Sequence, residues 1–186
     1  MKSRTYKLIL CALFAALTAI GAFIKIPFPL VPLTLQVMFT TLAGLLIGPK
    51  LGSISVAVYV FLGLIGIPVF TGGGGPSYVL QTSFGYLIGF IVGAFITGLI
   101  ASKGEPSFKR NLIASFTGLL VIYVIGCAYC FLISRLYLKN DVGIWAVVLH
   151  GAIMCLPGDI IKCILASFIG KRLAPMVRRK LNHGKA

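Results

Sequence analysis

The sequence contains 52 consecutive residues without a charged side chain, between Lys50 and Lys103, and this stretch constrains the fold more than any other feature. A helix that crosses a bilayer needs about 20 predominantly apolar residues, so this stretch alone can supply two crossings. Over the whole chain, 59% of residues are hydrophobic and 11% are charged, whereas roughly a quarter are charged in a soluble domain. The sequence therefore predicts an all-α membrane protein.

The apolar runs predict six transmembrane spans within a single integral membrane domain that comprises residues 1–186. The runs are continuous, unlike the alternating segments of about ten residues that are typical of a transmembrane β-barrel. The predicted spans are residues 8–24, 33–47, 51–70, 78–101, 112–134 and 144–169.

The basic residues predict the orientation of these spans, because cytoplasmic loops carry the excess of Lys and Arg. Thirteen of them lie on one side, three (Lys25, Arg135 and Lys139) on the other, and Lys162 lies within the last span. We therefore expect a multi-pass protein of a bacterial or archaeal plasma membrane with both termini in the cytoplasm. A cleaved signal peptide is the alternative for the basic N-terminus, but no clear small-x-small cleavage site follows the apolar run. This topology also accounts for the net charge of +14, so no nucleic-acid partner is inferred.

Two charged residues, Asp159 and Lys162, stand inside the last predicted span. The other acidic residues, Glu105 and Asp141, lie between spans. A charge at the centre of a membrane helix costs about 2.5–3.5 kcal/mol on insertion scales. Residues three apart share a helix face, so this carboxylate and ammonium can neutralise each other or bind one polar ligand. They form the leading candidate site.

Two of the outer connections have unusual compositions. Residues 25–36 contain three prolines, which disfavour a regular helix, yet the segment is strongly apolar and is expected to lie against the protein. Residues 70–78 contain four consecutive glycines, which permit a mobile hinge. The glycines do not occur in a phosphate-binding pattern. Together, the two connections predict a hinged lid over a ligand pocket.

Small residues recur at helix-packing spacing in two spans. In the fourth span, Gly85, Gly89 and Gly93 predict close internal packing. In the first span, the pattern fits either internal packing or docking of a partner protein; its members are Ala12, Ala15, Ala16 and Ala19.

No enzyme, metal site or cofactor is predicted. Cys127 and Cys130 form a CxxC, but it lies in an apolar span without further Cys or His at ligand spacing, which favours buried thiols. The sequence also lacks a Ser/His/Asp arrangement, a carboxylate cluster and HExxH.

Six segments, in this order, resemble one family over almost the whole chain. They are the alanine-rich first span, Pro-Leu-Val-Pro-Leu-Thr-Leu-Gln at 29–36, Leu-Leu-Ile-Gly-Pro-Lys-Leu-Gly at 45–52, Gly-Leu-Ile-Gly-Ile-Pro-Val-Phe at 63–70, Gly-Tyr-Leu-Ile-Gly-Phe at 85–90 and Leu-Pro-Gly-Asp-Ile-Ile-Lys at 156–162. Together they resemble the BioY family, the biotin-specific substrate-binding (S) components of energy-coupling factor transporters.

This resemblance implies the S-component fold, with six membrane helices that capture biotin from the outside. It implies a membrane-embedded coupling subunit and two cytoplasmic ATPases as partners; the chain itself has no ATP-binding motif. It also implies that the alanines of the first span contact the coupling subunit.

The resemblance places Asp159 and Lys162 at the substrate, where they can bind the N–H groups and the carbonyl of the biotin ureido ring. Candidates for the apolar walls are Phe28, Val31, Phe70, Tyr78 and Tyr86, and candidates for further polar contacts are Gln36, Gln81 and Ser83. Family members often read Gly-Pro-Thr-Gly-Gly-Tyr-Leu where this chain has Leu-Gln-Thr-Ser-Phe-Gly-Tyr-Leu at 80–87, so the contacts of the fourth span depart from that pattern.

Two alternatives stay open. One is an S component for a different vitamin, and the other is a membrane scaffold in which the Asp–Lys pair is purely structural. The Pro-Gly-Asp-x-x-Lys stretch favours biotin over other vitamins. The lid and the hinge favour a ligand-binding protein over a scaffold.

Overall fold

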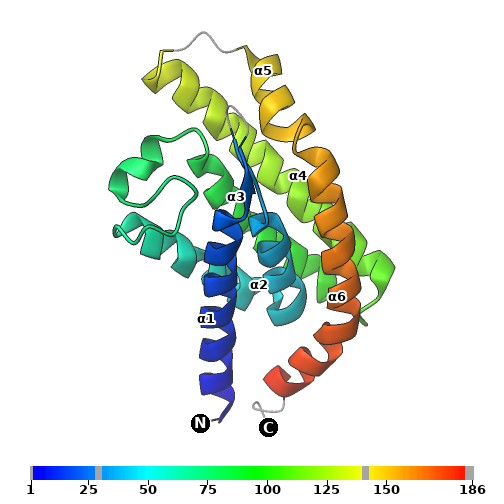
Figure 1. Cartoon of the computed structure of the whole chain (residues 1–186). Coiled ribbons are helices and arrows are strands. Elements are labelled where there is room, and N and C mark those ends of the chain that lie inside the picture. Colours follow the sequence, from blue (N-terminus) through cyan, green and yellow to red (C-terminus); the bar gives the residue numbers. More distant parts are fainter. Residues whose placement is uncertain (1, 28–30, 140–142, 183–186) are drawn as a thin grey trace.

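Long helices dominate the computed structural model, which describes residues 2–27, 31–139 and 143–182 (Figure 1). The long helices are α1 (Lys2–Phe23), α2 (Gln36–Leu64), α3 (Phe84–Ala101), α4 (Phe108–Leu132) and α6 (Leu156–Asn182). The short elements are β1 (Lys25–Ile26), β2 (Leu33–Thr34), the 3₁₀-helix η1 (Pro76–Leu80), α5 (Ile144–Val148) and the π-helical turns η2 (Ile133–Tyr137) and η3 (Leu149–Ile153).

Five helical stretches among the described residues are long and apolar enough to cross a membrane. They are Arg4–Phe23, Gln36–Leu64, Phe84–Ala101, Phe108–Tyr137 and Ile144–Leu181. The prediction of an all-α, multi-pass membrane protein is therefore confirmed. The predicted count of six is not confirmed, because most of the second predicted span and most of the third lie in the single helix α2.

Helix α2 is bent sharply at Gly48, whose φ of 82° and ψ of −179° are not helical. Glycine adopts this conformation without a steric penalty, and Pro49 follows it as the first residue of the second part. A Cβ placed on Gly52 would lie 2.9 Å from the carbonyl carbon of Ala43, although nine residues of straight helix span about 13.5 Å. The two parts of α2 therefore fold back on each other at the boundary that the sequence predicts.

Other span boundaries differ from the predictions. The third predicted span ends at Leu64 instead of residue 70, and the fourth begins at Phe84 instead of residue 78, because the intervening residues form turns and η1. The last predicted span is divided into α5, η3 and α6, and α6 continues to Asn182 rather than ending at residue 169.

Helix α3 packs between α2 and α4 through its glycines. A Cβ on Gly89 would lie 3.0 Å from the carbonyl oxygen of Ile122 and 3.1 Å from its Cα, and one on Gly93 would lie 2.7 Å from the Ile122 side chain. On the other side, a Cβ on Gly98 would lie 2.5 Å from the backbone nitrogen of Pro49. The predicted internal packing of the glycine ridge is confirmed.

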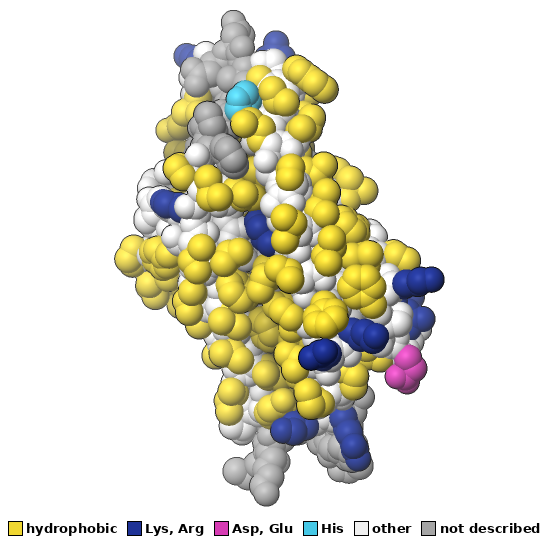
Figure 2. Space-filling model, turned by 45° about the vertical axis from the view of Figure 1, so that its right-hand side comes forward, with side chains coloured by type: hydrophobic (Ala, Val, Ile, Leu, Met, Phe, Trp, Pro, Cys, Tyr) yellow, Lys and Arg dark blue, Asp and Glu magenta, His cyan; other side chains and the backbone are white. Residues whose placement is uncertain are grey.

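The face of the molecule shown in Figure 2 is largely hydrophobic, as expected of a lipid-facing surface. Large apolar side chains such as Leu120, Ile113 and Trp145 are 62–70% exposed. On the face shown in Figure 2, more of the basic side chains lie toward the lower end, where both termini lie in Figure 1. Lys7, Lys50 and Arg178, which are far apart in sequence, line one pocket at this end. The structure thus brings together basic segments that the sequence predicts to lie on the same side of the membrane.

The α3–α4 contact predicts that Gly89→Val destabilises the protein, because its side chain would collide with the backbone of Ile122. We expect a loss of about 1–3 kcal/mol and a melting temperature several degrees lower, measured by thermal unfolding in detergent. Gly143→Val is the matched control, since nothing lies within 4 Å of a Cβ there and its φ is −65°. Equal melting temperatures for the two variants would contradict this packing.

Candidate functional site

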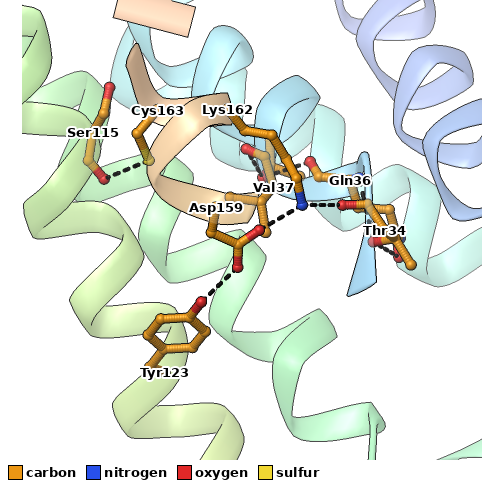
Figure 3. Close-up of polar contacts among 9 residues, drawn as sticks. Thr34, Gln36, Val37, Ser115, Tyr123, Asp159, Lys162 and Cys163 are labelled. Atoms are coloured by element: carbon orange, nitrogen blue, oxygen red, sulfur yellow. Dashed lines mark hydrogen bonds and ion pairs between the residues drawn. The ribbon is translucent and has the colours of Figure 1, made fainter. Parts of the chain in front are cut away.

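Asp159 and Lys162 form a buried ion pair at the start of α6, with 2.5 Å between Oδ1 and Nζ (Figure 3). The two residues are only 2% and 7% exposed. The Tyr123 hydroxyl donates a hydrogen bond to Oδ2 of Asp159 at 2.6 Å, and the Lys162 ammonium also donates to the Thr34 carbonyl at 2.6 Å. Each carboxylate oxygen therefore has a donor, and the ammonium has two acceptors. Such pairing is what burial of charged groups requires.

The residues before Asp159 explain its position. Pro157 and Gly158 lie in the first turn of α6, where the absent N–H of proline costs no helical hydrogen bond. The Asp159 amide donates to the Cys155 carbonyl at 3.0 Å, and the carboxylate lies in the first helical turn, where the helix dipole favours a negative charge. A Cβ on Gly158 would lie 2.9 Å from the Leu33 side chain, so a glycine here allows β2 to approach α6 closely.

The segment before α2 covers the ion pair as a short antiparallel hairpin, in which Lys25 pairs with Thr34 and Ile26 with Leu33. Thr34 in the return strand β2 and Val31 before it are both buried, each 7% exposed. The Lys25 ammonium contacts the Thr71 carbonyl in the second outer connection, so the two connections meet. For the described residues, this agrees with the prediction that the proline-rich connection of residues 25–36 lies against the protein.

The hairpin, the second outer connection and helices α2, α3, α4, η3 and α6 line a pocket with about 40 Å³ of free space. Asp159 lies in its wall, and most of the remaining wall is apolar. Predicted site residues that line it are Val31, Gln36, Tyr78, Ser83, Tyr86 and Asp159. Lys162 is not part of the wall and reaches the site through Asp159.

Hydrogen bonds hold the polar wall residues in place. The Gln36 amide donates to the Tyr59 hydroxyl at 2.8 Å, and its Oε1 accepts from Thr34 at 3.2 Å. The Tyr78 hydroxyl lies 2.9 Å from Oγ1 of Thr71, and the Tyr86 hydroxyl donates to the Gly151 carbonyl at 2.9 Å. The walls are therefore ordered by contacts within the protein.

Two predicted wall residues, Phe70 and Gln81, do not line the pocket. Phe70 is buried behind Tyr78, with 4.5 Å between the ring centroids, and packs edge-on against Tyr59. Gln81 is exposed in the turn before α3. Both corrections arise because residues 65–83 form a folded loop with a 3₁₀-helix instead of helix ends. Phe28 lies outside the described residues.

Tyr123 is the main site residue that sequence reasoning missed. It is one tyrosine among many apolar residues of α4, and its sequence neighbours do not indicate which face of the helix contacts α6. The available signal was its hydroxyl, which needs a partner in an apolar environment. Other unpredicted wall residues include Leu87, Phe90, Ile122 and Cys155.

A buried polar seam continues from the ion pair between α4 and α6. The Ser115 and Ser167 hydroxyls lie 3.2 Å apart, the Cys163 thiol points to the Ser115 carbonyl at 3.9 Å, and the Asn111 amide donates to the Ser167 carbonyl at 3.3 Å. Figure 3 shows Ser115 and Cys163 close to the charged pair. The described residues contain no cluster of three or more His, Cys, Asp or Glu that could hold a metal ion.

The four alanines of α1 do not form a single surface. Ala12 and Ala16 are exposed, whereas Ala15 is 5% exposed in the core and Ala19 is half-buried against it. Residues i and i+3 differ by about 60° around a helix of 3.6 residues per turn, so the two pairs face different surroundings. This corrects the expectation that all four are available to a partner.

Comparison with known proteins agrees with this architecture. The model of the BioY family matches residues 1–179. The chain is 43% identical to a probable biotin transporter BioY of Lysinibacillus sphaericus over 94% of this chain and 89% of the relative. It is 41% identical to a probable biotin transporter BioY of Pyrococcus horikoshii over 93% and 98%.

A solved structure is similar over nearly the full length. It is the crystal structure of the S-component for biotin from an ECF-type ABC transporter, with a TM-score of 0.77, 30% identity and 92% of each chain covered. Family match, sequence identity and fold point to the same conclusion: this chain belongs to the BioY family.

Proposed function

We propose that this chain is the S component of an ECF-type ABC transporter, which binds biotin and serves in its uptake. The observation that carries the proposal is the buried Asp159–Lys162 pair, whose carboxylate lies in the wall of an apolar, hairpin-covered pocket. Membership of the BioY family supports biotin over another vitamin as the ligand.

The hydrogen-bonding capacity of the pair suits the ureido ring of biotin. An ionised carboxylate offers about four acceptor sites and a lysine ammonium three donors. Within the protein, Asp159 accepts two hydrogen bonds and Lys162 donates two. Asp159 can therefore accept a ureido N–H, and Lys162 has one donor left for the ureido carbonyl. In a desolvated pocket these charge-assisted bonds are stronger than neutral ones.

One wall of this pocket differs from the others in its structure. The short hairpin forms one wall through its residues Val31 to Thr34. The other walls are largely helices packed against one another. Contacts from Lys162 to the Thr34 carbonyl and from Lys25 to the Thr71 carbonyl hold the hairpin closed. We therefore assign the opening movement to the hairpin.

The remaining parts of the proposal concern topology and assembly. The two parts of α2 count as the second and third of six membrane segments in one integral membrane domain, and both termini lie in the cytoplasm of a bacterial or archaeal cell.

The protein is not an enzyme; a membrane-embedded coupling subunit and two cytoplasmic ATPases supply the energy. Exposure of Ala12 and Ala16 supports this part of α1 as the docking surface.

A structural scaffold accounts less well for the geometry. An ion pair that serves only stability would not need to line a pocket beneath an apolar hairpin. An S component for another vitamin would share the architecture, so ligand titration separates the two vitamin hypotheses.

Asp159→Asn is expected to weaken biotin binding at least 30-fold, because loss of one partner of a buried charge pair costs about 2–5 kcal/mol. Isothermal titration calorimetry with biotin measures the effect. Glu105→Gln makes the same chemical change at an exposed position and should bind like the wild type. A wild-type protein that gives no heat with biotin, but binds another vitamin, would refute the assignment of the ligand.

Tyr123→Phe is expected to weaken biotin binding at least tenfold, since the hydroxyl orients Asp159 and a hydrogen bond to a charged group contributes roughly 1.5–3 kcal/mol. The control is Tyr137→Phe, because Tyr137 is 55% exposed. Equal affinity of the Tyr123 variant and the wild type would show that Asp159 needs no positioning by α4.

Ala16→Trp is expected to abolish co-purification with the coupling subunit while leaving biotin affinity unchanged, because a bulky side chain prevents close approach to α1. Leu120→Trp, at an outward-facing position of α4 that is already 62% exposed, is the control. If the complex forms equally well with both variants, the coupling subunit docks elsewhere.

A further inference from the structure

A second pocket lies far from the ion pair, at the end of the molecule where the termini meet, and has a volume of about 740 Å³. Four parts of the chain form it: the beginning of α1, the bend in α2, the residue after α3 and the end of α6. It is lined by Lys7, Ile47, Gly48, Pro49, Lys50, Leu51, Ile54, Ser102, Arg178 and Leu181. None of the proposed biotin-binding residues takes part in it.

The polar lining of this pocket is strongly basic. Lys7, Lys50 and Arg178 contribute three positive charges, and none of the described residues that line the pocket is acidic. Lys7 is partly exposed and Lys50 is exposed, so both ammonium groups can meet a ligand from outside. Unbalanced positive charge of this kind attracts an anion.

Arg178 fixes the inner wall of the pocket. Its guanidinium donates to the Ala101 carbonyl at 2.9 Å and to the Leu45 carbonyl at 2.8 Å. These bonds tie α6 to the end of α3 and to the first part of α2. Arginine has five N–H donors, so the two bonds leave three that can bind an anion without loss of the structural contacts.

The rest of the lining is apolar, and it distinguishes a lipid from a small anion. Ile47, Leu51, Ile54 and Leu181 lie beside the basic groups. Ile54 is 52% exposed, and it adjoins the hydrophobic surface that faces lipid. A free phosphate would gain nothing from this part of the wall, whereas a phospholipid can place its phosphate at the basic groups and its glycerol and upper acyl chains against the apolar ones.

We propose that this pocket binds the headgroup of an anionic phospholipid. Basic pockets between membrane helices on the positively charged side of a protein are suited to anionic headgroups. One bound lipid would contact the beginning of α1, the bend of α2 and the end of α6 at the same time. The proposal is independent of the identity of the substrate.

The test compares two double variants with equal loss of charge. Lys7→Gln/Lys50→Gln removes both exposed pocket cations and leaves the structural bonds of Arg178 intact. Lys103→Gln/Lys109→Gln removes two exposed lysines that do not line the pocket. Purified full-length proteins in a neutral detergent are titrated with palmitoyl-oleoyl phosphatidylglycerol, phosphatidylcholine of the same chains, or inorganic phosphate. Native mass spectrometry measures the first adduct, and thermal unfolding confirms that each variant is folded.

We expect one tight phosphatidylglycerol adduct on the wild type and the Lys103/Lys109 variant, and weak binding of phosphatidylcholine and phosphate. The Lys7/Lys50 variant should bind phosphatidylglycerol about 30-fold more weakly, if each lysine contributes as a basic residue does at an anionic membrane surface. Three results would overturn the proposal: equal weakening in both variants, equal binding of the two lipids, or phosphate binding as tight as that of phosphatidylglycerol. Loss of coupling-subunit binding in the Lys7/Lys50 variant with unchanged lipid binding would assign the pocket to a protein partner instead.

Discussion

The burial of two opposite charges, Asp159 and Lys162, is the constraint on which the rest of the site depends. Neither charge is tolerable alone in an apolar protein interior, and an ion pair 2.5 Å long satisfies only part of their hydrogen-bonding capacity. The remaining partners come from elsewhere in the fold: Tyr123 from α4 and the Thr34 carbonyl from the hairpin. Helix α6, helix α4 and the hairpin must therefore meet at one point.

The close packing of α3 against α4 helps to set that meeting point. Ile122 lies against Gly89 and Gly93 of α3, and the next residue, Tyr123, is turned by about 100° around the helix toward α6. A larger residue in the glycine ridge would displace α4 and, with it, the donor to Asp159. Gly158 has a similar role on the other side, because it permits Leu33 and hence β2 to approach α6. Small residues in this protein thus position charged ones that they do not contact.

Prediction from the sequence succeeds best where the insertion of a single residue into the membrane has a large free-energy cost. The absence of charge predicted the membrane helices, the exceptional charges predicted the ion pair, and the proline-rich composition predicted a segment that lies against the protein. These inferences need only local composition and the energetics of transfer into lipid. Most of the pocket residues expected from the resemblance also line the pocket.

Features that depend on how helices meet were not predictable in the same way. The fold-back of α2 depends on the backbone conformation of Gly48, and the split of the α1 alanines depends on which side of that helix packs against α2. Tyr123 carried no local signal of its partner. Gln81 and Phe70 were misplaced because a folded loop occupies the region where helix ends were expected. In each case the decisive information is a contact between segments distant in sequence.

The most direct test of the central claim is a structure of the protein with biotin bound. We expect the ureido ring to lie within hydrogen-bonding distance of the Asp159 carboxylate and the Lys162 ammonium, with Tyr123 still donating to Asp159 and the hairpin closed over the ligand. Biotin bound at another place, or with its ureido ring directed away from an intact Asp159–Lys162 pair, would contradict it.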